Sequence, residues 1–391
     1  MRRDPAIVLL ALGQTLAWAS IYYLFPALLL RWEQTLGWSK TELTAAIAMA
    51  VLISAALSPL TGRIIDRGHG ASLVLGSAIV GGIGLALLSF VSELWQFHAV
   101  WMVIGAAMAG CLYEPIFALV TRARGDRARQ AIILITLVAG FASTISYPAI
   151  YSLAEAAGWR GAVRIASAVM ILLVAPVHWV GVRRLDSEGA AGRVAKVASE
   201  PTRAFLQNPA FWFLAAGFAC LAITHGATLH HLLPILDERG LSAEMAVLAA
   251  SFIGPMQVAG RLAMMASERY LSNNGVAIAA FGLLGLSVVL LMFSGSSPAF
   301  LSASVILFGG AYGTVSILRP LLAREILGET NFGAKSGALA MPYLAGSAIS
   351  PFLGSILWSI GGYDFMLILL TVCIALGGVL YAFAYRLAKR S

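Results

Sequence analysis

Apolar stretches of about 20 residues recur along the whole chain, separated by short polar or glycine- and proline-rich breaks. As an α-helix, each stretch is long enough to cross a hydrocarbon core of about 30 Å. The pattern predicts an all-α membrane protein with twelve transmembrane helices, near residues 6–30, 43–62, 72–91, 97–120, 129–153, 162–182, 210–236, 244–266, 275–294, 299–322, 335–360 and 365–385.

Composition agrees with this reading, because 60% of the 391 residues are hydrophobic and only 11% are charged, whereas a soluble domain carries about a quarter charged residues. The longest connection between predicted spans is residues 183–209, so no soluble domain is expected. The first apolar segment is too long for the core of a signal peptide, and we expect it in the mature protein.

The distribution of lysine and arginine predicts the orientation of the chain. With both termini in the cytoplasm, 19 of the 26 basic residues fall in inside loops and five in outside loops, as the positive-inside rule requires. We therefore expect a multi-pass protein of the bacterial inner membrane with cytoplasmic termini. The net charge of +8 then reflects topology and attraction to anionic membrane lipids, and no nucleic-acid partner is expected.

The two halves of the chain resemble one another at an offset of roughly 205 residues. "LGWSKTEL" corresponds to "RGLSAEMA", and "LYEPIFA" corresponds to "ILRPLLA", which sets Glu114 and Pro115 against Arg319 and Pro320. This predicts two pseudo-symmetric six-helix bundles, 1–182 and 210–391, joined by a cytoplasmic linker, 183–209. Such a six-plus-six repeat is the plan of major facilitator transporters, whose substrate site lies near the midplane between the halves.

The stretch "GRIIDR" resembles the signature loop of the major facilitator superfamily and supplies a gating motif of Gly62, Arg63, Asp66 and Arg67. The resemblance implies the major facilitator fold and transport by alternating access, in which the two halves rock against each other. The basic cluster that usually follows the loop in this family is replaced here by "GHGAS".

Three further stretches, "GWSKTEL", "GWRGAVRIASA" and "REILGETNFGAKSGALAM", resemble the monocarboxylate-porter branch and its relatives, the oxalate/formate exchangers. That branch binds the substrate carboxylate with an arginine in the eighth span, and Arg261 stands at the matching place. The acidic residue four positions earlier is Gln257 here, and the span 1 lysine of the animal porters is Ala27. The proton-handling pair of the animal porters is therefore absent from this chain, and the resemblance does not imply their coupling mechanism.

Three charged residues, Glu114, Arg261 and Arg319, fall within predicted spans at similar depths. A charge at the bilayer centre costs from about 2.5 to above 10 kcal/mol, so such residues face a partner or a wet cavity. Arg261 is predicted to bind an anion, with a structural pair or a snorkelling side chain as the alternative. Glu114 and Arg319 form an ion pair across the halves, or act as a proton carrier and a second anion contact, or do both in turn, since protonation of Glu114 would break the pair and release Arg319. The prolines that follow them predict kinks in spans 4 and 10.

Other polar side chains in the spans extend this candidate site. Tyr22, Tyr23, Tyr113, Gln257 and Tyr343 are candidate substrate contacts, with packing as the alternative for the tyrosines. His225 is a candidate for proton coupling, whereas His230 and His231 are expected at the outer membrane interface.

No phosphate-binding GxxxxGK[ST] loop occurs in the chain, and no cofactor, metal or catalytic constellation is indicated. The sequence therefore predicts a monomeric secondary transporter of small organic anions, chiefly monocarboxylates, that is either coupled to protons or exchanging. An efflux carrier for hydrophobic drugs or for another metabolite is the alternative. A membrane sensor or a membrane-embedded enzyme would be a different class of protein.

Overall fold

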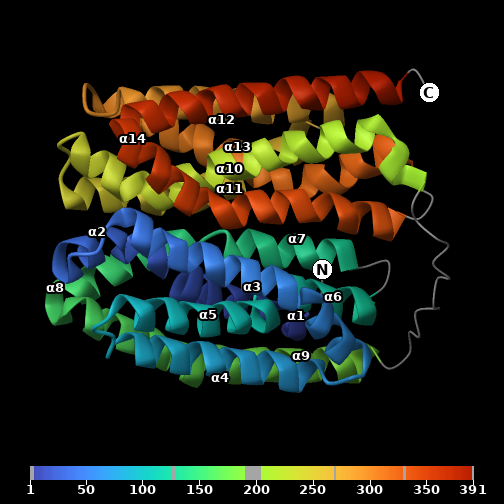
Figure 1. The fold of residues 1–391 in the computed structure, drawn as a ribbon. Helices are drawn as coiled ribbons and strands as arrows, with labels where there is room; N and C mark the ends of the chain where they lie inside the picture. Colours follow the sequence, from blue (N-terminus) through green and yellow to red (C-terminus); the bar gives the residue numbers. More distant parts are fainter. Residues whose placement is uncertain (1–3, 125–127, 190–203, 268–269, 329–331, 390–391) are drawn as a thin grey trace. The chain divides into compact units, whose positions relative to one another are not determined.

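The computed structural model describes residues 4–124, 128–189, 204–267, 270–328 and 332–389. Helices and turns make up this part of the chain, and none of it forms a strand. It divides into two compact units, Met1–Lys196 and Val197–Ser391, each of which is described by itself (Figure 1). The domain boundaries at 182 and 210 stay predictions, and much of the predicted linker lies outside the described residues.

The first unit contains nine α-helices and two short π-helices among its described residues. They are α1 (Pro5–Ala17), π-helix η1 (Trp18–Tyr22), α2 (Leu24–Leu36), α3 (Lys40–Asp66), α4 (Gly70–Leu88), α5 (Leu94–Cys111), α6 (Tyr113–Arg124), α7 (Ala128–Ala139), α8 (Ala142–Val169), π-helix η3 (Met170–Val174) and α9 (Ala175–Gly189). The described part of the second unit starts with a short 3₁₀ turn and continues in long helices, namely η4 (Ala204–Gln207), α10 (Pro209–Glu238), α11 (Ala243–Ser267), α12 (Asn273–Met292), α13 (Pro298–Leu327) and α14 (Phe332–Ala388).

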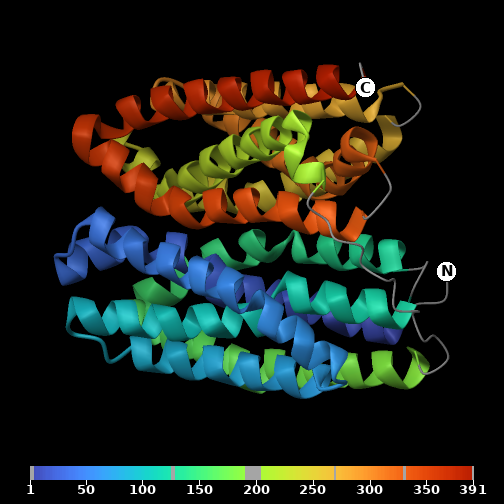
Figure 2. The same ribbon diagram turned by 45° about the vertical axis from the view of Figure 1, so that its right-hand side comes forward.

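Ten stretches of the described helices are long and apolar enough to span a membrane, and two of them are far too long for a single span. Gln130–Ser187 has 58 residues and Ala338–Ala388 has 51, whereas about 20 suffice. The backbone leaves helical geometry at Gly158 (φ 68°) in the first and at Gly361–Gly362 in the second. Each stretch is therefore two spans, which gives the predicted twelve, and Figure 2 shows α14 folded into two arms.

The internal repeat is visible in the local structure of the two units. Helices α3, α4 and α5 begin 203 or 204 residues before α11, α12 and α13. Gly37 (φ 73°) ends the first span of its unit, and Gly240 (φ 75°) ends the first span of the other. Glycine takes this left-handed conformation without steric cost. Two residues later, Ser39 and Ser242 accept hydrogen bonds from the first-turn amides of α3 and α11.

The first span contains a π-helical turn just before Pro26. The Tyr23 amide donates to the Trp18 carbonyl at 3.0 Å, one residue further back than in an α-helix. This leaves the Ala19 carbonyl without its usual amide, and the Ser146 hydroxyl on α8 donates to it at 2.7 Å. The turn therefore couples the direction of Tyr22 and Tyr23 to the packing of α8.

The fourth span is broken as its proline predicts, whereas the tenth is not. Helix α5 ends at Cys111, Leu112 is extended (φ −89°, ψ −155°), and α6 starts at Tyr113. Helix α13 instead continues through residue 320 to Leu327 as one helix. The same charge–proline motif thus gives a break in the first unit and continuous helix in the second.

Candidate functional site

In the second unit, Arg261 lies in the packed region between α11 and α13. It is 6% exposed, and its Nε donates to the Gly313 carbonyl on α13 at 2.9 Å. Glycines allow this approach, because a Cβ on Gly309 would lie 2.6 Å from the Cβ of Met256. The bond through Nε fixes the plane of the guanidinium. In general, a guanidinium can bind a carboxylate with two parallel N–H donors.

Gln257 precedes Arg261 by one helical turn, so the two side chains lie on the same side of α11. Gln257 is 5% exposed, and its amide Nε2 has no hydrogen-bond partner within the described residues. A buried donor without a partner costs about 1–3 kcal/mol. The Gln257 amide is therefore a candidate donor to an oxygen atom of a ligand.

Three other predicted residues of the second unit meet through Tyr312, which the sequence analysis missed. The His225 ring stacks on the Tyr312 ring, with centroids 3.2 Å apart and planes 6° apart. The Tyr312 and Tyr343 hydroxyls are 2.7 Å apart, and the Arg319 guanidinium carbon lies 4.3 Å from the centroid of the Tyr343 ring. This chain of contacts runs from α10 through α13 to α14. Tyr312 also directly precedes Gly313, the residue that holds Arg261.

In the first unit, the predicted tyrosines belong to a continuous row of rings. Tyr113 is 4.8 Å from Trp18, and Trp18 is 4.9 Å from Tyr22, measured between ring centroids. Tyr22 contacts Tyr23 at 5.6 Å, and Tyr23 contacts Tyr147 at 6.0 Å. Trp18 and Tyr147 were not among the sequence candidates. The row brings together side chains from the first, fourth and fifth spans.

Glu114 is exposed in the first turn of α6, next to Tyr113. Arg319 is half-buried on α13 and belongs to the other unit. Their pairing stays a prediction, since each unit is described by itself.

The signature stretch forms the end of α3 rather than a separate loop. Gly62 and Arg63 lie in its last turns, the helix ends at Asp66, and Arg67 follows as the C-cap. The Asp66 side chain lies outside the described residues. Arg122 from α6 donates to the Ile65 carbonyl, and a cation there complements the negative end of the α3 dipole.

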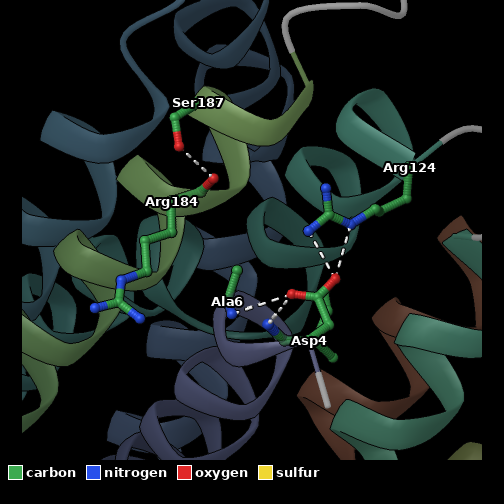
Figure 3. A network of polar contacts seen from close by, with 6 residues as sticks. Asp4, Ala6, Arg124, Arg184 and Ser187 are labelled. Carbon is green, nitrogen blue, oxygen red and sulfur yellow. Dashed lines mark hydrogen bonds and ion pairs between the residues drawn. The ribbon is translucent and has the colours of Figure 1, made fainter. Parts of the chain in front are cut away.

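A second contact ties α6 to the start of α1. Arg124 donates through Nε at 3.0 Å and through Nη2 at 2.7 Å to the same oxygen of Asp4. Figure 3 shows both bonds as dashed lines. The other carboxylate oxygen accepts from the Ala6 amide at 3.1 Å, which caps α1. Asp4 therefore joins two helix termini that the chain separates by 120 residues.

The interfacial position expected for His230 and His231 stays a prediction, but their side chains do not face the surroundings of the second unit. Both are buried, because this face of α10 packs against α14. The His231 ring nitrogens lie 3.1 Å from the Tyr363 hydroxyl and 2.9 Å from the Pro351 carbonyl. These histidines serve packing within the second unit.

Comparisons with known proteins agree with this architecture. The sequence profile of the Major Facilitator Superfamily matches residues 10–273. The chain is 24% identical over 334 residues to the Fujikurins efflux protein of Gibberella fujikuroi, covering 83% of this chain and 69% of that protein. It is 24% identical over 309 residues to Monocarboxylate transporter 12 of Xenopus laevis, covering 70% and 67%. The solved structure of a bacterial homolog to the human lysosomal transporter Spinster, inward-facing and occupied, superposes with a TM-score of 0.68 at 15% identity, covering 99% of this chain and 97% of that one.

Proposed function

The chain belongs to the major facilitator superfamily, and from this premise we propose that it is a secondary active transporter of small organic anions, chiefly monocarboxylates. The observation that carries the proposal is the pair Arg261 and Gln257, a buried cation anchored through Nε beside a buried amide without a partner in the described residues. Monocarboxylate transporter 12 of Xenopus laevis, at 24% identity, supports the same class of substrate.

The chemistry of this pair suits a carboxylate. A guanidinium keeps its charge at every physiological pH, so its affinity for an anion does not depend on its own protonation. Bonds from a charged donor to a carboxylate are about twice as strong as neutral ones. The Gln257 amide can donate to a further oxygen of the same ligand, which offsets the cost of its burial.

We propose substrate contacts at Tyr343 and Arg319 as well, because both connect to Tyr312, the residue directly before the Gly313 anchor of Arg261. Tyr22, Tyr23 and Tyr113 contribute rings in the first unit. For the coupling we propose protons or exchange, with Glu114 and His225 as the titrating candidates, since Gln257 is neutral where the branch carries an acid.

An efflux carrier for a larger metabolite is the second candidate. The observation that favours it is the similarity to the Fujikurins efflux protein, which equals the similarity to the monocarboxylate transporter in percentage identity. Under both candidate functions the protein is a membrane carrier. The two functions differ in the size and charge of the substrate.

Replacement of Arg261 tests the substrate class. In proteoliposomes, we expect Arg261→Ala to reduce uptake of a labelled monocarboxylate to background, because the variant lacks the cation that we propose binds the carboxylate. The loss of a charge-assisted contact of about 1.5–3 kcal/mol lowers affinity roughly 10- to 150-fold. Arg261→Lys is the matched control, since it keeps the charge without the planar pair of donors, and should retain partial uptake. Undiminished uptake by a folded Arg261→Ala protein would exclude the assignment.

Replacement of Glu114 tests the coupling. We expect Glu114→Gln to leave uptake measurable while removing its dependence on pH, because glutamine is nearly isosteric but does not titrate. The measurement is initial uptake between pH 5 and 8, with His225→Gln as the parallel variant. If Glu114→Gln shows the same pH dependence as the wild type, Glu114 carries no proton.

A further inference from the structure

The break between α5 and α6 leaves a buried carbonyl that the helix itself does not satisfy. In a continuous helix, the amide of residue 115 would donate to the carbonyl of Cys111, four residues earlier. Pro115 has no N–H, and its ring crowds that carbonyl. Cys111 is fully buried, so its carbonyl needs a donor from elsewhere in the unit.

Gln14 on α1 supplies that donor. Its Nε2 lies 2.7 Å from the Cys111 carbonyl, and its Oε1 accepts from the Trp18 indole at 3.2 Å. The indole can only donate and the carbonyl can only accept, so this orientation of the amide is the one that satisfies both. Gln14 is itself fully buried.

His178 on α9 completes the cluster. Its ring Nε2 lies 3.3 Å from the Gln14 Nε2 and accepts the second amide hydrogen, which leaves the ring proton on Nδ1. A glycine beside Gln14 makes room for the ring, because a Cβ on Gly13 would lie 2.7 Å from the His178 Nε2. The side chain of Gln14 is thus held from three sides, by α5, η1 and α9.

We propose that Gln14 is a positioning residue for transport. It fixes the break at Leu112 and thereby sets the direction in which the Tyr113 and Glu114 side chains project from α6. Two contacts carry this inference. The bond to Cys111 replaces the one that Pro115 removes, and the bond to Trp18 holds the ring against which Tyr113 packs at 4.8 Å. The transport readout of this proposal rests on the proposed function, whereas its stability readout does not.

The stability readout is a double-mutant cycle between Gln14 and Pro115. We expect Gln14→Met, which keeps the length but removes both the donor and the acceptor of the amide, to lower the thermal midpoint of the purified protein by about 2–4 °C. Pro115→Ala restores a backbone N–H that can donate to Cys111. In that background Gln14→Met should cost less than half as much. An equal loss in both backgrounds would overturn the proposal, and Gln14→Asn replaces Gln14→Met if the latter does not fold.

The transport readout asks whether Gln14 acts through Glu114. We expect Gln14→Met to lower kcat for uptake at least fivefold and to flatten its pH dependence, as Glu114→Gln does. In the Glu114→Gln background, Gln14→Met should add less than a twofold change. Thr15→Val is the matched control, since the Thr15 hydroxyl donates within α1 to the Ala11 carbonyl at 2.9 Å, and the variant should keep the pH profile.

The two readouts separate the two ideas. Suppose that the stability cycle shows coupling but Glu114→Gln keeps the wild-type uptake and pH dependence. The proposed role of Glu114 then fails. Gln14 in that case only stabilises the helix break, and its proposed role in transport is overturned. If Glu114→Gln alters the pH dependence but Gln14→Met leaves it unchanged, the proposed function holds and the positioning role is overturned.

Discussion

At the level of single residues, the Gly313 carbonyl on α13 holds the buried Arg261 guanidinium through its Nε. Arg261 is recognisable because a cation stands in an apolar run. Its anchor is the backbone carbonyl of Gly313. Every residue carries such a carbonyl, so no side-chain pattern could indicate which one accepts from Arg261. Tyr312 was missed for a related reason, since a tyrosine in an apolar span usually packs and only its neighbours show otherwise.

Gly313 itself offers a residue-level prediction. A Cβ there would lie 2.7 Å from the Cα of Gln257, so Gly313→Ala must push α11 away from α13 and loosen the Arg261 bond. We expect a destabilisation of about 1–3 kcal/mol, measured by thermal unfolding, together with weaker uptake.

Gly282→Ala on α12 is the matched control for this change. A Cβ at Gly282 would meet nothing within 4 Å, and alanine is the better helix former by about 0.5–1 kcal/mol. The control should therefore be neutral or slightly stabilising. Equal thermal midpoints for the two variants would contradict the close packing described between α11 and α13.

At the level of elements, the number of spans could be predicted, but not which of the proline-containing spans is interrupted. The length of an apolar run depends only on local composition, which is why the twelve spans are correct. A break needs a donor for the freed carbonyl, and that donor comes from a distant helix. Gln14 lies 97 residues from Cys111, and Ser146 lies 127 from Ala19. Proline alone therefore did not distinguish the broken fourth span from the continuous tenth.

At the level of the whole molecule, the duplication was readable because its markers have a local structural meaning. Gly37 and Gly240 are required by left-handed turns, and Ser39 and Ser242 by the helix starts that follow. These positions tolerate few other residues, so they remain similar in the two halves. The side chains that distinguish the halves, such as Glu114 and Arg319, follow no such constraint.

The orientation of the chain gives a whole-molecule prediction. Because 19 of the 26 basic residues fall in loops on one side, we expect both termini in the cytoplasm. In a bacterial host, a fluorescent protein fused to the C-terminus should fluoresce, whereas alkaline phosphatase at the same place should be inactive. Fusions after Gly240, in a predicted outside loop, provide the control and should give the reverse pattern. Active phosphatase at the C-terminus would contradict the orientation.

The turn at Gly158 has a consequence for how the protein is made. Within Ala142–Val169, that single glycine departs from helical geometry, so the fifth and sixth spans are joined almost without a loop. A connection this short holds the two helices next to each other as soon as both have formed, so we expect them to enter the lipid together as one hairpin. The reversal at Gly361–Gly362 leads to the same expectation for the last two spans.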